Sequence, residues 1–375
     1  MGSEKIGKKD LEGLFEAIKG SDPEGARTVF QRILACGADP WEVHLSLFPI
    51  VQGVLNPPFI NPHLPKAYGI VRELSGYLEP GDLAALVGLE IQEYTRRPKL
   101  EIPPIPGTPK SPLSIEDIQE AIRERDRLTA AHLMRGYYFQ KGGSELSRSL
   151  LLLGSGYLDQ TLGHSISCTA FILREMLQRE GQDPWPVLFA LAHYFCEGGF
   201  DAFPREDPST CAVSEDEAVD YMLKATTGRG IVNLHHTITF YALAKVGNMF
   251  SREERIDLLC AVVRFMKDKA AEPIGPPNPG QAAPRDYSRF YSVFSQRDLK
   301  SAFSALARMP RIEQGRQKVG RFLIRGVCDL YQGNYDPHFL TGLGALLWVL
   351  QEYPDQEELS QKALFQYLDY YLGNL

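Results

Sequence analysis

Apolar residues recur along nearly the whole chain with the spacing of an α-helix. Segments such as DLEGLFEAIKG, SIEDIQEAIRERD and SREERIDLLCAVVRFM repeat them every three or four positions, which gathers them on one helix face. The strict alternation of apolar and polar residues that is typical of strands is nearly absent. Ser114 with Asp117 and Ser251 with Glu254 have the spacing of capping boxes, which mark helix starts. The pattern therefore predicts an all-α protein.

Two proline-rich stretches, residues 97–112 and 272–284, interrupt the helical pattern and suit extended connections. The helical segments between them show a degenerate internal repeat. We therefore expect a single domain, residues 1–375, built from about four helical hairpins around a shared centre. The expected hairpins cover residues 8–97, 113–197, 213–270 and 296–375.

Histidine-led segments are the clearest sign of this repeat. HLPKAYG, HSISCTA, HTITFYA and HFLTGLG share the pattern H-x-x-[KST]-x-x-[GA], with a small residue that would let helices pack closely. The leading histidines are His63, His164, His236 and His338. Counted from the neighbouring His235, the pattern fails, because Ile238 and Tyr241 occupy the shared positions. We therefore predict that His236 faces the common centre and that His235 turns toward a neighbouring helix or toward a residue that supports a ligand.

Composition and charge narrow the class of protein. The chain has 375 residues, 44% of them apolar, and a formal net charge of −7 with acidic and basic residues interspersed. No basic stripe is present for binding nucleic acid, and no apolar run is long enough to span a membrane. The N-terminal MGSEKIGKKD lacks the apolar core of a signal peptide, and the six scattered cysteines without CxxC suit reduced thiols. We expect a cytoplasmic protein that binds neither nucleic acid nor membrane.

The candidate chemistry has to come from residues that lie far apart in the sequence. HExxH, Glu-x-x-His, GxSxG, Walker A and GxGxxG motifs are absent. Converging imidazoles without thiolates favour iron, copper, nickel or zinc. Lys66 is the one lysine at the third position after a repeat histidine, and carboxylation would make it an anionic oxygen ligand. The predicted metal ligands are His63, His164, His236, His338 and Lys66, and the residues expected around them or in their pocket are His235, His193, Thr239, Thr341 and Tyr335.

Other interpretations of these residues remain open. Each repeat histidine could be an ordinary hydrogen-bonded residue at the start of a packing helix. His193 and Cys196 have the spacing of a base and a nucleophile on one helix face, although a core or capping role is the commoner one. Cys168 lies one turn beyond His164 and is either a buried thiol or a residue bordering the same cavity.

Three histidine-led stretches resemble a known family. HLPKAYGIVRELSGYLEPGD, HHTITFYALAKV and HFLTGLGALLWVLQ are similar to the histidine-led helices of the questin-oxidase-like family. Its members are all-α oxygenases that act on polycyclic aromatic ketones through non-haem iron held by several histidines and a carboxylated lysine. The resemblance implies that the four repeat histidines are iron ligands. No lysine follows His338 closely, so Lys66 is the candidate on its repeat position alone.

Three functions are compatible with the sequence. The first is a metal-dependent oxidoreductase or oxygenase with non-haem iron, acting with O₂ on an aromatic or apolar small molecule. The second is a haem-binding protein with axial histidines, which would hold its haem noncovalently because CxxCH is absent. The third is a metal-free helical scaffold for protein interactions, in which the repeat is purely architectural.

Overall fold

The fold is known from a computed structural model. It describes residues 6–107, 113–179, 181–201, 214–269, 273–278, 286–309, 314–333 and 335–375. Within these ranges the chain forms twenty α-helices, one short 3₁₀ helix and no strand beyond three isolated β-bridges. The prediction of an all-α protein is confirmed.

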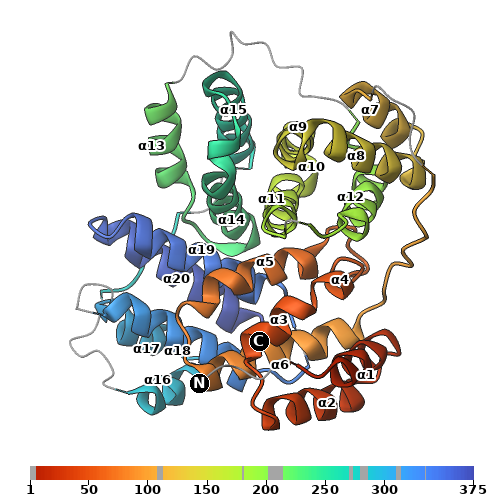
Figure 1. Ribbon diagram of the computed structural model, residues 1–375. Helices are drawn as coiled ribbons and strands as arrows, with labels where there is room; N and C mark the ends of the chain where they lie inside the picture. The colour runs from red at the N-terminus through yellow and green to blue at the C-terminus, as the bar shows by residue number, and fades with distance from the viewer. Residues whose placement is uncertain are drawn as a thin grey trace.

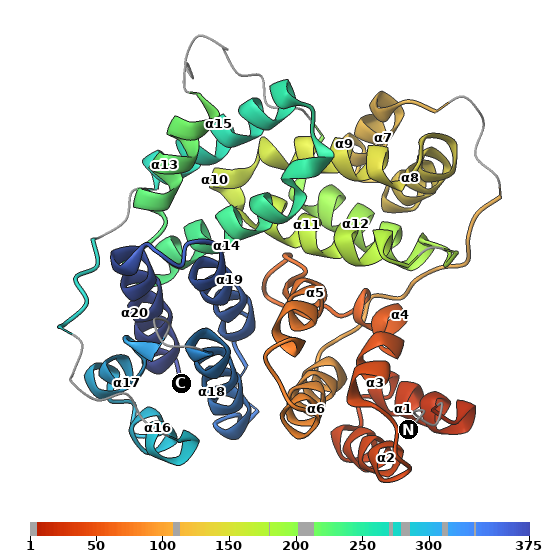
Figure 2. The same ribbon diagram turned by 60° about the vertical axis from the view of Figure 1, so that its left-hand side comes forward.

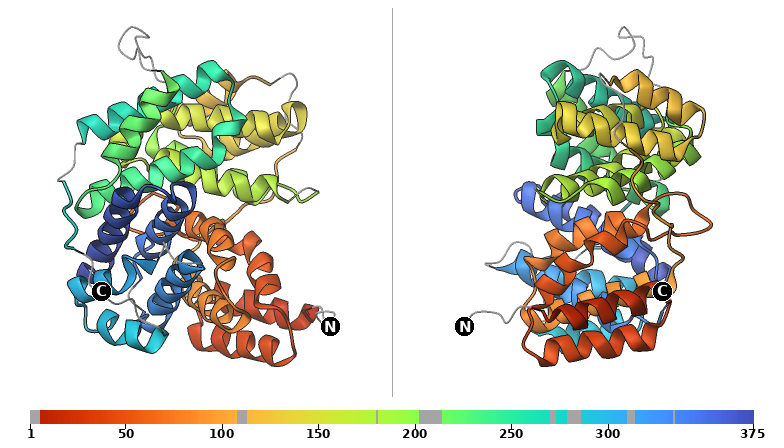
Figure 3. Two further views of the ribbon diagram at one scale, coloured as in Figure 1. Left: turned by 90° about the vertical axis from the view of Figure 1, so that its left-hand side faces the viewer. Right: turned by 45° about the vertical axis from the view of Figure 1, so that its right-hand side comes forward.

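The helices form two layers, and each layer is built from different segments of the chain (Figures 1 and 2). The first and last parts of the chain lie side by side in one layer, and the middle part forms the other, as two further views also show (Figure 3). The first part contains α1 (Lys8–Lys19), α2 (Pro23–Ala35), α3 (Pro40–Ser46), α4 (Phe48–Val51), α5 (His63–Ser75) and α6 (Pro80–Arg96). The middle part contains α7 (Ile115–Arg123), α8 (Arg127–Lys141), α9 (Gly143–Ser155), α10 (Leu158–Thr161), α11 (His164–Leu177), α12 (Trp185–Gly198), α13 (Glu215–Ala225), α14 (Gly230–Val246), η2 (Gly247–Met249) and α15 (Arg252–Asp268). The last part contains α16 (Tyr287–Phe294), α17 (Leu299–Leu306), α18 (Gly315–Asp329), α19 (His338–Glu352) and α20 (Glu357–Gly373).

Local sequence signals explain where several helices begin. Ser114 and Ser251 each accept a hydrogen bond from the third residue of their helix, and the acidic side chain there bonds back to the cap. Both predicted capping boxes are therefore present, and each cap stabilises its helix by about 1 kcal/mol. His63, His164 and His338 are each the first residue of their helix, whereas α14 begins at Gly230, several residues before its histidine pair.

Four helices form a closed ring at the junction of the two layers. Helix α5 packs against α11, α11 against α14, α14 against α19, and α19 against α5. Small residues permit these close approaches. A Cβ atom at Gly69 of α5 would lie 3.1 Å from the Phe171 carbonyl oxygen of α11, and one at Gly344 of α19 would lie 2.6 Å from Ile70 Cγ2. The division into hairpin repeats and its boundaries stay a prediction.

Two further features bear on the expectations from composition. In the part of the chain that the structure describes, no helix is both long and apolar enough to cross a membrane. Cys260 of α15 forms a disulfide bond, so the expectation of six reduced thiols is wrong for this residue. Spacing along the sequence did not indicate it, because a disulfide depends on which cysteines the fold brings together.

Candidate metal centre

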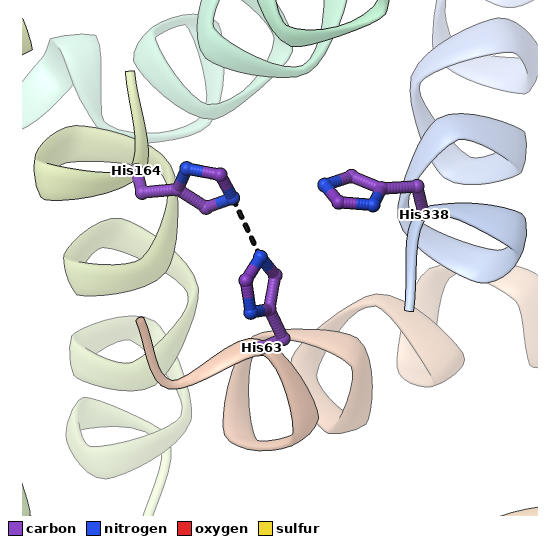
Figure 4. Close-up of side chains that lie close together, drawn as sticks. All are labelled: His63, His164 and His338. Atoms are coloured by element: carbon purple, nitrogen blue, oxygen red, sulfur yellow. Dashed lines mark hydrogen bonds between the residues drawn. The ribbon is translucent and has the colours of Figure 1, made fainter. Parts of the chain in front are cut away.

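Four imidazoles from the four ring helices converge on one point. The Nε2 atoms of His63 and His164 lie 2.7 Å apart, those of His164 and His235 3.2 Å, and those of His235 and His338 3.0 Å. Figure 4 shows His63, His164 and His338 pointing toward one another, and one ligand atom from each lies within 4.8 Å of the others. The helix ring therefore brings histidines from distant parts of the sequence into one cluster.

In α14, the histidine that faces the cluster is not the one that the sequence predicted. His235 joins the cluster, whereas the ring of His236 lies against Phe265 of α15, with ring centroids 5.0 Å apart. The expectation that His236 faces the centre is therefore wrong. Neighbouring helical positions point about 100° apart, so only one of the two can face inward.

The repeat alignment failed because α14 carries a large residue where the other helices carry a small one. Counted from His235, this position is Tyr241, whose ring packs against Phe171 of α11 and Trp348 of α19. Helix α19 leaves space for the Tyr241 ring because it has a glycine, Gly344, at the contact. A Cβ atom at Gly344 would lie 3.5 Å from that ring. Close packing thus needs a small residue on one side of the contact only, and a pattern that demands one in each helix selects the wrong histidine.

Three of the four imidazoles have an oxygen acceptor at Nδ1. His164 Nδ1 lies 2.6 Å from the Thr161 carbonyl oxygen, and His235 Nδ1 lies 2.7 Å from that of Ile231. His338 Nδ1 lies 2.6 Å from Asp336 Oδ1. These oxygens can only accept, so Nδ1 carries the hydrogen in each neutral ring. The lone pair of Nε2 is then directed at the centre, which is the arrangement typical of metal-ligating histidines.

These lone pairs face one another without a hydrogen between them. The contacts of His235 with His164 at 3.2 Å and with His338 at 3.0 Å each join two acceptors, which repel unless a cation lies among them. A proton is a poor candidate for that cation. Burial lowers the pKa of all four imidazoles, and repulsion by neighbouring positive groups takes those of His63, His164 and His235 well below the ordinary 6.5. The cluster could therefore hold a metal ion.

The spacing of the nitrogens also indicates how an ion would be held. Four nitrogens about 2.1 Å from one ion lie about 3.0 Å from their neighbours at right angles, but about 3.4 Å apart in a tetrahedron. Of the three Nε2 separations, 3.0 Å equals the right-angled value, 3.2 Å lies midway between the two values, and 2.7 Å is a hydrogen-bond distance.

Lys66 lies close to the cluster on the side away from solvent. It follows His63 by one turn of α5, is 0% exposed, and its Nζ has no hydrogen-bond partner among the described residues. Its charge lowers the pKa of each of the four imidazoles, and burial lowers the pKa of Lys66 itself. Thr341 Oγ1, one turn beyond His338, is likewise buried and has no partner in the described ranges. A buried, unpaired amine is costly, so Lys66 needs a partner that these side chains do not supply.

A pocket of about 440 Å³ opens beside the four imidazoles. Its wall includes all four rings together with Phe59, Tyr335 and Tyr370, but not Lys66. Tyr370 donates a hydrogen bond to Asp336, which also accepts from His338. Although burial raises the pKa of Asp336, the hydrogen bonds from His338 and Tyr370 hold it down at about 2. Asp336 therefore stays a carboxylate that orients His338.

The remaining predicted residues lie at different distances from the cluster. Tyr335 lines the pocket, as expected for a residue near the site. Thr239 is buried against the turn before α11, because a Cβ atom at Gly163 would meet its Oγ1 at 2.0 Å. Both therefore lie close to the cluster or to the turn that leads into it.

His193 lies outside the pocket, with Nδ1 3.5 Å from an Arg127 guanidinium nitrogen. Burial raises the pKa of both Cys196 and Cys168 to about 11, which disfavours a nucleophilic thiolate at either. These cysteines therefore behave as core thiols.

Sequence reasoning missed Asn56, Arg97 and Tyr370, which line the pocket beside the imidazoles. Asn56 lies in the loop before α5, Arg97 directly follows α6, and Tyr370 belongs to α20. None of them is part of a histidine repeat or a spacing motif, so no signal along the chain singled them out. Asp336 does carry a local signal, because an Asp-Pro pair directly before His338 is typical of a helix start.

Comparisons with known proteins give no relative for this site. No family model, no curated protein and no solved structure matches the chain. The chemistry of the site has to be inferred from its own residues.

Proposed function

We propose that the protein is a metal-dependent oxygenase or oxidase whose non-haem iron binds to Nε2 of His63, His164, His235 and His338. The observation that carries this proposal is the convergence of three Nε2 lone pairs, 3.2 and 3.0 Å apart, from rings whose Nδ1 atoms donate to oxygen. Such an arrangement is unfavourable without a cation, and the lowered pKa values of the imidazoles disfavour a proton in that role.

The ligand set supports iron over zinc and over haem. Structural zinc sites usually include cysteine thiolates, and no cysteine is among the described residues that line this pocket. A haem iron takes four nitrogens from its porphyrin and has no use for four converging imidazoles. Imidazoles alone also suit copper. The resemblance to the questin-oxidase-like family supports iron in preference to copper.

Lys66 is the proposed fifth ligand, in carboxylated form. Its neutral amine would add CO₂, forming a nitrogen–carbon bond and releasing one proton, and the lowered pKa of Lys66 favours the neutral amine that this step needs. The product would be an anionic oxygen ligand from a residue that does not line the pocket. An anion there is useful because three of the histidines begin helices, and the positive helix ends disfavour a cation.

The remaining residues of the site have supporting roles. The Thr161 and Ile231 carbonyls and the Asp336 carboxylate fix the orientation of three rings. Phe59, Tyr335 and Tyr370 offer an apolar and aromatic wall for a small substrate in the pocket. Bound iron would supply the binding and activation of O₂ on the pocket side. Burial of the rings keeps bulk water from the other side.

The experiment compares the two neighbouring histidines of α14. Wild type, His235→Ala and His236→Ala are purified after iron-replete expression, and iron content and absorption spectra are measured, with circular dichroism as the check on folding. We expect about one iron per wild-type chain without a Soret band, retention of iron in His236→Ala, and its loss in His235→Ala. A Soret band would instead support a haem protein, and a metal-free wild type would support the metal-free helical scaffold. Loss of iron in His236→Ala alone would refute the proposed ligand set.

A further inference from the structure

His63 differs from the other three imidazoles in what faces its Nδ1. Those three face oxygen acceptors, but His63 Nδ1 lies 3.2 Å from Asn56 Nδ2, the nitrogen of a side-chain amide. An amide nitrogen can only donate. His63 Nδ1 accepts in this contact, so it carries no hydrogen of its own.

Arg97 fixes the orientation of the Asn56 amide. Arg97 Nη1 donates to Asn56 Oδ1 over 2.8 Å, and a guanidinium has no acceptor. The oxygen of Asn56 must therefore face Arg97, and its nitrogen must face His63. Arg97 is itself held by the Glu93 carboxylate at 3.1 Å and the Tyr335 carbonyl at 3.2 Å. Turning the amide over would place its nitrogen, a donor, against the donating Arg97 guanidinium.

The other nitrogen of His63 leads to the same assignment. His63 Nε2 lies 2.7 Å from His164 Nε2, a short hydrogen-bond distance. His164 already donates from Nδ1 to the Thr161 carbonyl, so its Nε2 is an acceptor. His63 must then donate from Nε2. Two independent contacts thus assign the hydrogen of neutral His63 to the nitrogen that faces the centre.

A hydrogen on Nε2 prevents that nitrogen from binding an ion. For His63 to become a ligand, its hydrogen has to move to Nδ1 and find an acceptor there. The Asn61 carbonyl is close enough to the ring to raise the pKa of His63, although burial lowers that pKa by more. The donor at Asn56 therefore favours the neutral form of His63 that cannot bind an ion.

We propose that Asn56, oriented by Arg97, is a positioning residue that opposes metal binding by His63, so that an ion binds first to His164, His235 and His338 and His63 joins last. This inference rests on the proposed metal centre. It makes His63 the weak and exchangeable ligand of the four. Asn56 and Arg97 also line the pocket. A ligand bound there would therefore contact the two residues that set which nitrogen of His63 carries the hydrogen.

The test uses Co²⁺ as a spectroscopic probe in the full-length chain after removal of other metals. Affinity is measured by competition with a chelator, and the d–d absorption band reports the number of ligands. Asn56→Ala removes the opposing donor, and Asn56→Asp replaces it with an acceptor for a hydrogen on Nδ1. We expect tighter Co²⁺ binding in both variants, by about tenfold or more in Asn56→Asp, in line with the effect of outer partners on metal affinity.

A matched control separates hydrogen bonding from charge. Gln160 lines the same pocket and is exposed, so Gln160→Glu adds a similar negative charge there, and we expect a smaller change in affinity than for Asn56→Asp. Weaker Co²⁺ binding by Asn56→Ala would overturn the inference, because it would make Asn56 an ordinary support of His63. Equal effects of Asn56→Asp and Gln160→Glu would also overturn it. If wild type binds no Co²⁺, the proposed metal centre fails as well.

Discussion

At the scale of single residues, the central imidazoles resist protonation, and this makes the stability of the metal-free protein depend on pH. Above pH 6.5, the ordinary pKa of histidine, the rings are neutral in both folded and unfolded chains. Below pH 6.5, these histidines bind protons in the unfolded chain. In the folded chain they stay neutral, because their pKa values are lowered. The free energy of unfolding should therefore fall as pH decreases from 6.5 toward those lowered values.

His235→Asn tests this dependence. Each proton that binds to the unfolded chain but not to the folded chain changes the free energy of unfolding by about 1.4 kcal/mol per pH unit. The variant lacks one such proton, so its slope should be smaller than the wild-type slope by that amount. Urea unfolding of the chelator-treated proteins between pH 7.5 and 5.0 measures both slopes. Identical slopes would mean that His235 is protonated equally easily in the folded and unfolded chains.

The individual residues also show which parts of the site could be predicted from the sequence. His63, His164 and His338 were found because each begins a helix, where the sequence signals are local. His235 was placed beside the centre and not in it, because the choice between adjacent residues depends on the rotation of α14 about its axis, which Tyr241 and its neighbours set through packing. Asn56 and Arg97 act through contacts with each other and with His63, and no spacing along the chain encodes those contacts.

At the scale of helices, the close approach of α5 and α19 sets the distance between His63 and His338. Gly344→Ala should disturb it, since the new Cβ atom would lie 2.6 Å from Ile70 Cγ2. We expect a loss of about 1–3 kcal/mol in the free energy of unfolding, as for other overpacked cores, together with weaker metal binding.

Gly13→Ala in α1 is the matched control for that variant. Nothing lies within 4 Å of its added Cβ atom, and alanine favours a helix interior over glycine by up to about 1 kcal/mol. Chemical unfolding of both variants should therefore give changes of opposite sign. Equal stability in the two would contradict the tight α5–α19 contact.

The helices also mark what the hydrophobic pattern could and could not predict. The period of apolar residues and the boxes at Ser114 and Ser251 were sufficient for the all-α class and for the starts of α7 and α15. The pattern contains no information on which helices touch. The ring of α5, α11, α14 and α19 joins segments from both layers, and it follows from packing between distant parts of the chain.

At the scale of the whole molecule, the imidazoles converge where helices of the two layers pack together, α11 against α5 and α14 against α19. Helices α5 and α19 come from the layer that holds both ends of the chain, and α11 and α14 come from the other. An ion bound by all four rings would therefore link the layers, and its binding would stabilise the folded chain as a whole.

The most direct test of this account is X-ray diffraction with anomalous scattering at the iron edge, on protein expressed with iron. The account predicts one anomalous peak among the four rings, about 2.0–2.3 Å from Nε2 of His63, His164, His235 and His338, with none at His236. No peak at this position, or a peak bound by His236 in place of His235, would contradict it.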